Sequence, residues 1–192
     1  MFRRGFKTWA ERTSLRVRQK LKLLPSSPLD PLRLAELLGV SVVASSDLSD
    51  LPEDVRRRLV NDHRDCWSAI TVTDGHGHLI VTNLSHAQTR LNSSLAHEIA
   101  HIVLSHEPSM MFISANSGIA LRTHNEEQED EANWLAGCLL LPREALVTIR
   151  RIGRSDEEVC SEYGVSPAML RFRLNTTGVD VQLRRARKIR RR

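Results

Sequence analysis

Two histidines four residues apart, with a glutamate directly after the first, are the side chains in this sequence best suited to metal chemistry. They are His97, Glu98 and His101. Residues four apart on a helix lie one above the other, so both imidazoles can bind one metal ion from a single face. Glu98 lies one residue further round, where it can act on an activated water without filling the coordination shell. The spacing therefore predicts zinc-assisted hydrolysis with Glu98 as the catalytic base.

The sequence around this motif argues against a chance match. In a chain with 8 histidines among 192 residues, a random H-E-x-x-H has a probability of roughly 0.02. The motif lies in an apolar stretch from Leu95 to Leu104, where burying three ionisable side chains costs free energy unless they are paired. A metal ion supplies that pairing. The alternative is a polar stripe on the surface of an otherwise buried helix.

Zinc needs a third protein ligand, and two known arrangements provide one. The metzincin pattern places Gly at the eighth position of the motif and His at the eleventh, but Leu104 and Glu107 stand there. The thermolysin-like arrangement takes a carboxylate from a later helix instead. The acidic run 126–131 opens such a helix, so the sequence favours a carboxylate ligand.

Among these acids, Glu129 is the preferred third ligand. It shares a helical face with Ala132 and Ala136, on the apolar side, whereas Glu131 lies at the margin and is the second candidate. Asn133, four residues after Glu129, is on the same side and could orient the ligands from behind. The donor set predicts one Zn²⁺ per chain, although Mn²⁺ also suits histidine and carboxylate ligands.

Hydrophobic periodicity indicates the elements that must position these side chains. The expected helices are 6–24, 31–38, 89–105 and 126–141, and the expected strands are 40–44, 66–73 and 78–83. The last two strands flank a Gly-rich turn and predict a hairpin. A short helix is also predicted at 52–60, whereas 108–124 is expected to be irregular. The fold class is α+β: a zincin-like metallopeptidase domain with a small antiparallel sheet packed on the active-site helix, and a helical C-terminal extension.

The segment 155–174 has the pattern of a helix, a glycine turn and a second helix. Ser155 can cap the first helix, Gly164 can end it, and Arg171 and Arg173 are expected to face outward. The alternative function is therefore a DNA-binding transcription regulator with a structural or inactive metal site. Direct nucleic-acid binding is not favoured, because helix pairs with a glycine corner are common packing units.

The length of 192 residues suits one catalytic unit with appendages. The predicted boundaries are 1–150 for the metallopeptidase domain, 151–180 for the helical extension and 181–192 for a basic tail. The formal charge of +5 is due to that tail, which holds seven basic residues, and the rest of the chain is close to neutral. The tail is expected to be a solvated, mobile extension.

Cysteine usage and hydropathy predict a cytoplasmic protein that does not enter membranes. Cys66, Cys138 and Cys160 are an odd number without C-x-x-C spacing, which favours a reducing compartment. The first residues lack the apolar core of a signal peptide, and no uncharged stretch reaches the length of a membrane span.

The two motifs together resemble the ImmA/IrrE metallopeptidase family. Its signature joins A-H-E-x-x-H to a later E-x-x-A-N-x-x-A-x-x-L-L-x-P, and the chain matches both, at 96–101 and 129–142. The resemblance implies that Glu129 is the third zinc ligand, in agreement with its helical face. It also implies a bacterial endopeptidase that cleaves a helix-turn-helix transcriptional repressor and so induces gene expression. Leu135 departs from the pattern at a position that is often aromatic, a difference that concerns core packing.

A further hydrogen-bond donor is expected to stabilise the oxyanion of the tetrahedral intermediate. Tyr163, His86 and His106 are the candidates, although side chains of these types are more commonly surface or packing residues. His76 and His78 belong to the Gly-rich turn and are expected to be exposed polar residues outside the site.

Overall fold

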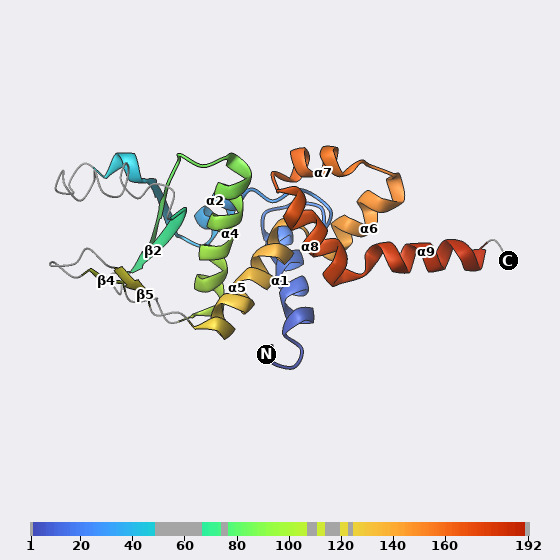
Figure 1. Ribbon diagram of the computed structural model, residues 1–192, viewed down its shortest axis with the longest axis horizontal. Helices are drawn as coiled ribbons and strands as arrows, with labels where there is room; N and C mark the ends of the chain where they lie inside the picture. The colour runs from blue at the N-terminus through green and yellow to red at the C-terminus, as the bar shows by residue number, and fades with distance from the viewer. Residues whose placement is uncertain are drawn as a thin grey trace.

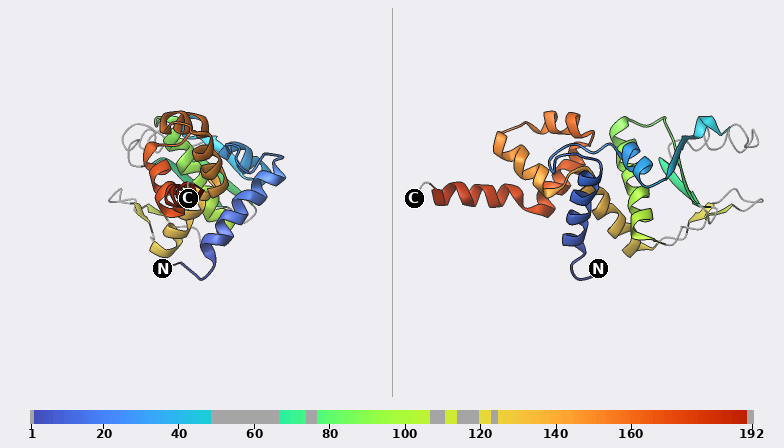
Figure 2. Two further views of the ribbon diagram at one scale, coloured as in Figure 1. Left: turned by 90° about the vertical axis from the view of Figure 1, so that its right-hand side faces the viewer. Right: turned by 180° about the vertical axis from the view of Figure 1, so that it is seen from behind.

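The computed structural model describes residues 2–48, 67–73, 77–106, 111–113, 120–122 and 125–190. A small sheet lies at one end of the molecule, a group of packed helices lies in the middle, and α9 projects from the other end (Figures 1 and 2). In chain order the elements are α1 (Phe6–Lys20), α2 (Pro31–Leu37), β1 (Ser41–Ala44), a 3-10 turn (Ser45–Asp47), β2 (Ala69–Thr73), β3 (His78–Thr82), α4 (Gln88–Leu104), β4 (Met111–Ile113), β5 (Ala120–Arg122), α5 (Glu126–Leu140), α6 (Arg143–Ile152), α7 (Asp156–Tyr163), α8 (Pro167–Thr177) and α9 (Val179–Arg190).

The helices predicted at 31–38, 89–105 and 126–141 are confirmed to within a residue or two. The first helix ends earlier than predicted, because Lys22 takes a left-handed φ of 57° and the amide of Leu23 bonds back to the carbonyl of Arg18 at 2.8 Å. The helix predicted at 52–60 lies outside the described residues. Within the described helices, none combines the length and the hydropathy of a membrane-spanning segment.

The three-stranded sheet has the order β1-β3-β2. The predicted hairpin is confirmed, since β2 and β3 pair antiparallel from Ala69 opposite Thr82 to Thr73 opposite His78. The prediction of an all-antiparallel sheet was wrong, because β1 pairs parallel with β3. β3 gives one edge to its hairpin partner, so β1 joins the other edge, and the long connection from β1 to β2 allows the parallel direction.

Four further elements differ from the sequence-based expectations. β4 and β5 pair antiparallel within the stretch predicted to be irregular, and strands of three residues are too short for periodicity to indicate. α6 was not predicted. The basic run expected to be mobile is helical as far as Arg190, since Gly178 ends α8 at φ 64° and the buried Val179 anchors the start of α9.

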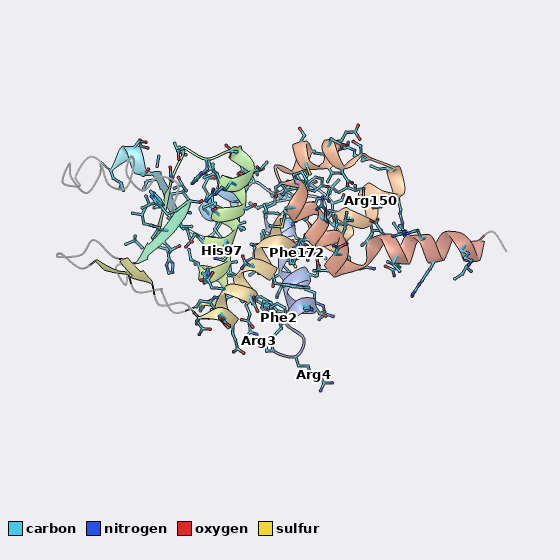
Figure 3. The ribbon with its side chains drawn as sticks, in the orientation of Figure 1. Phe2, Arg3, Arg4, His97, Arg150 and Phe172 are labelled. Atoms are coloured by element: carbon cyan, nitrogen blue, oxygen red, sulfur yellow. The ribbon has the colours of Figure 1, made fainter. Side chains whose placement is uncertain are left out.

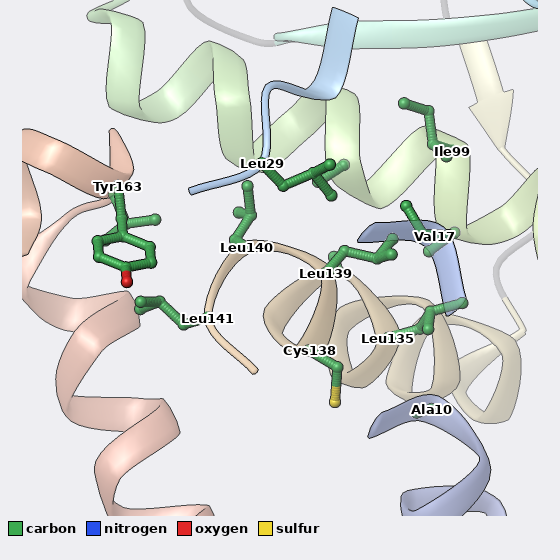
Figure 4. Close-up of a cluster of buried hydrophobic side chains, with 14 of the residues drawn as sticks. Ala10, Val17, Leu29, Ile99, Leu135, Cys138, Leu139, Leu140, Leu141 and Tyr163 are labelled. Atoms are coloured by element: carbon green, nitrogen blue, oxygen red, sulfur yellow. The ribbon is translucent and has the colours of Figure 1, made fainter. Parts of the chain in front are cut away.

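The core forms where α4, α5 and α1 pack on one another. Ile99 of α4 and Leu139 of α5 are fully buried, and Ala10 and Val17 of α1 belong to the same buried cluster (Figure 4). Leu135, the departure from the family pattern, is also fully buried, in the part of α5 that faces α1. An aliphatic side chain therefore fills the space between these two helices.

The C-terminal end of α5 is buried, and side chains from other helices bind its last carbonyl groups. Such carbonyls have no partner within their own helix, so leaving them unpaired in the core would cost free energy. Ser14 Oγ donates to the carbonyl of Cys138 at 2.6 Å, and Arg18 Nη2 donates to that of Leu139 at 2.8 Å. Arg18 is fully buried, and this burial lowers its pKa to about 10.

Arg173 lies in the same cluster and corrects one prediction. It was expected to face outward like Arg171, which is indeed exposed, but it is fully buried. Its Nε donates to the carbonyl of Leu141 at 2.9 Å, and its Nη2 contacts Glu11 at 2.5 Å. Gly137 makes room for it, because a Cβ there would lie 2.9 Å from Arg173 Cδ. The close approach of α8 to a glycine of α5 thus turns this arginine inward.

We expect Arg18→Leu to lower the free energy of unfolding by about 2–4 kcal/mol, because it leaves several buried acceptors unpaired. Arg12→Leu, on the exposed side of the same helix, should change it by no more than about 0.5 kcal/mol. Urea denaturation of both variants beside the wild type measures the difference. Equal effects of the two substitutions would contradict a structural role for Arg18.

Candidate metal centre

The motif His97-Glu98-x-x-His101 lies on α4, between the sheet and α5. Ala96, Ile99 and Ala100 on this stretch are buried, and they hold the helix against its neighbours. The side chains of His97 and His101 are 18% and 13% exposed, so both are largely withdrawn from solvent yet open on one side. Figure 3 shows His97 beside the N-terminal half of α5.

Glu129 in the first turn of α5 completes a triad with these histidines. Its Oε2 lies 3.2 Å from His97 Nε2, its Oε1 lies 3.6 Å from His101 Nε2, and the two Nε2 atoms are 3.0 Å apart. Ligands at about 2.0–2.1 Å from a tetrahedral ion are about 3.3 Å from each other. The three separations therefore match the ligand set of a single zinc-sized cation.

A hydrogen bond from His97 to Asn133 determines which ring nitrogen of His97 carries the proton. His97 Nδ1 lies 3.0 Å from Asn133 Oδ1, and because an amide oxygen can only accept, Nδ1 carries the ring proton. The Nε2 lone pair of a neutral His97 therefore points at the carboxylate of Glu129. Facing lone pairs repel one another unless a cation lies between them, so the donor set fits a metal ion.

Glu98 is placed beside the triad and not in it. Its side chain is nearly buried, and its Oε2 accepts a hydrogen bond of 2.6 Å from Thr71 Oγ1 on β2. No other described residue donates to this carboxylate, so Oε1 is available to a reacting water. The sequence did not indicate a role for Thr71, because it is one of several β-branched residues in a predicted strand.

Glu131, the second candidate for the third ligand, takes a different position. Its Oε2 lies 3.4 Å from His106 Nε2, and its Oε1 lies 3.6 Å from Arg3 Nε. His106, a candidate oxyanion donor, also contacts the metal motif directly, with its Nδ1 3.0 Å from His101 Nδ1. Glu131 and His106 thus lie behind His101, on the side away from the triad.

The other candidate oxyanion donors are engaged elsewhere. The hydroxyl of Tyr163 donates to the carbonyl of Ser26, and burial raises the pKa of that hydroxyl. Figure 4 shows Tyr163 beside Leu141, at the other side of the core from Ile99. His86 Nε2 lies 3.0 Å from the carbonyl of Trp67.

Of the two turn histidines, the structure describes His78, which does not contact the triad. His78 is exposed on β3, as predicted, and His76 lies outside the described residues. Tyr163 and His86 contact backbone carbonyls, and His106 contacts the Nδ1 side of His101. None of these three side chains is assigned as the oxyanion donor.

The chain is thus a mixed α+β protein with a candidate triad of metal ligands on two packed helices. Residues 35–175 match the family described as IrrE N-terminal-like domain, Peptidase_M78. The match covers most of the chain, which belongs to the ImmA/IrrE metallopeptidase family. None of the curated proteins matches the chain.

Among solved structures, the chain is similar to a Mycobacterium tuberculosis transcriptional regulator, with a TM-score of 0.53 and 16% sequence identity. The likeness covers 90% of this chain and 47% of the other, so the chain spans about half the length of that regulator. A likeness at this level of identity shows the fold alone.

We expect Glu129→Gln to reduce bound zinc from about one ion per chain to a small fraction, because the amide is a much poorer ligand than the carboxylate. Glu126→Gln, in the same turn but exposed, serves as the matched control and should bind zinc like the wild type. Elemental analysis after dialysis against metal-free buffer gives both values. Full zinc occupancy in Glu129→Gln would remove this residue from the ligand set.

Proposed function

We propose that this protein is a zinc-dependent endopeptidase with a zincin-like active site. His97, His101 and Glu129 are the metal ligands, and Glu98 is the catalytic base. The observation that carries the proposal is the convergence of three metal-binding atoms from two helices, all within 4.8 Å of one another. The pattern of the motif and the family membership support the same assignment.

The proposed chemistry divides the work between the metal and Glu98. His97, His101 and Glu129 would hold the zinc ion, which would supply Lewis-acid activation of a water molecule at neutral pH. Glu98 accepts a proton from the attacking water at Oε1 and passes it to the leaving amine. Thr71 holds Oε2, which keeps the carboxylate in one orientation. Mn²⁺ would also suit these ligands.

The substrate is proposed to be a protein, specifically a helix-turn-helix transcriptional repressor. The family resemblance supports this class of substrate. β2 is one of the two edge strands of the described sheet, and it carries Thr71, which contacts Glu98. An extended segment paired along the outer edge of β2 would therefore pass close to Glu98. A cytoplasmic location is part of the proposal, and it agrees with the free thiols of Cys138 and Cys160.

The DNA-binding alternative is weakened by the position of Arg173. The predicted helix pair is present, with a capping box at Ser155 and a left-handed Gly164 between α7 and α8. One of the two arginines that would reach DNA is, however, buried against α5. The helix pair is therefore better explained as packing for the C-terminal end of α5.

We expect Glu98→Gln to keep about one zinc per chain and to lower peptide hydrolysis by roughly 10²–10⁴-fold, the usual contribution of a general base. The assay uses candidate repressors from neighbouring genes, with zinc measured on the same preparations. His97→Ala combined with His101→Ala should lose both zinc and hydrolysis. Undiminished turnover in Glu98→Gln, or wild type without zinc, would contradict the proposal.

The contact from Thr71 predicts a smaller effect. Thr71→Val removes a hydrogen bond to a charged group, and we expect kcat to fall by at least about tenfold with KM nearly unchanged. Thr71→Ser keeps the hydroxyl and should retain most of the activity. Steady-state kinetics on both variants distinguishes the hydroxyl from the bulk of the side chain, and equal losses would exclude the hydrogen bond as the cause.

A further inference from the structure

A line of hydrogen-bonding side chains leads away from the metal site through the back of His101. His101 Nδ1 lies 3.0 Å from His106 Nδ1, and His106 Nε2 lies 3.4 Å from Glu131 Oε2. Resting on the metal site of the proposed function, we infer that His106 and Glu131 are positioning residues. They hold the ring of His101 for the metal and thereby set the affinity for zinc.

The order of donors and acceptors along this line follows from its two ends. At one end the carboxylate of Glu131 can only accept, so His106 Nε2 carries a proton. At the other end, His101 binds the metal through Nε2, so its ring proton is on Nδ1. His106 Nδ1 must then be the acceptor, and one neutral tautomer of His106 satisfies both neighbours. The line thus requires one tautomer of His101, the one that offers Nε2 to the metal.

The backbone at the end of α4 brings His106 to this position. Ser105 ends the helix with a left-handed φ of 53°, and the amide of His106 then bonds back to the carbonyl of His101 at 3.0 Å. The chain turns through this residue, so a histidine five positions after His101 returns to its ring. A continued helix would have placed position 105 there, and not position 106.

The contact between His106 and Glu131 is buried, whereas the contact between Glu131 and Arg3 is exposed to solvent. The side chains of His106 and Glu131 are 7% and 18% exposed, so solvent screens their contact little. Arg3, 3.6 Å from Glu131, is 64% exposed, and pairs of that kind contribute little to stability. We therefore assign the effect to His106 and Glu131, with Arg3 contributing least.

The two histidines proposed to bind zinc consequently donate to different kinds of hydrogen-bond acceptor. His97 donates to the neutral amide of Asn133, whereas His101 donates to an imidazole that is itself bound to a carboxylate. A carboxylate behind a histidine raises its basicity as a ligand, and loss of such partners costs roughly 10–100-fold in metal affinity. His101 is thus the more strongly supported of the two ligands.

The test measures the dissociation constant for Zn²⁺ by competition with a chelator, with no substrate present. Three substitutions divide the functions of His106. His106→Asn places an amide oxygen where His106 Nδ1 lies, so it still accepts from His101. His106→Gln reaches toward Glu131 only, and His106→Leu makes neither contact. We expect His106→Gln and His106→Leu to weaken zinc binding by roughly 10–100-fold and His106→Asn to recover most of that loss. Glu131→Gln should weaken it by about tenfold, the low end of that range.

His78→Leu, at an exposed histidine of β3, is the control and should bind zinc like the wild type. Thermal unfolding of each metal-free variant separates a loss of affinity from a loss of fold, and Asn and Gln, both polar, remain comparable if Leu destabilises the protein. Equal affinities in the wild type, His106→Gln and His106→Leu would overturn the inference, as would equal losses in His106→Asn and His106→Gln. Wild type that binds zinc but hydrolyses no peptide overturns the proposed function alone, and wild type without zinc overturns both.

Discussion

The burial of the C-terminal end of α5 is the constraint on which the rest of the structure depends. Each carbonyl left unpaired there would cost about 1–3 kcal/mol. α1 and α8 supply the donors, in Ser14, Arg18 and Arg173. Acidic residues occupy the other end of the same helix, and both ends therefore complement its dipole. With its C-terminal end fixed in this way, α5 holds Glu129 against the histidines of α4.

Those parts of the site that depend on a single helix could be predicted from the sequence. His97, Glu98 and His101 follow from helical spacing, and the orientation of Glu129 and Asn133 follows from the apolar face that they share. The contacts observed for Glu129 and Asn133 agree with that reasoning.

Contacts that depend on the packing of the sheet or on an irregular backbone could not be predicted in this way. Thr71 reaches Glu98 only because the sheet packs on α4, and His106 reaches His101 only because Ser105 adopts a left-handed conformation. Arg173 was misplaced for a related reason: arginine is usually exposed, and nothing near it in the sequence shows that Gly137 leaves it a space. The parallel pairing of β1 likewise depends on which edge of β3 is already occupied.

The position of α1 has a consequence for how the family boundary is understood. The matched residues 35–175 begin after α1, yet α1 contributes Arg18 and Ser14 to the end of α5 and Glu11 to Arg173. The residues that match the family and the unit that folds are therefore not the same in this chain. A fragment cut at the family boundary would keep Arg173 but lose Ser14 and Arg18, two of the three donors to the end of its central helix. The proposed metal ligand at the opposite end of that helix would then be less firmly held.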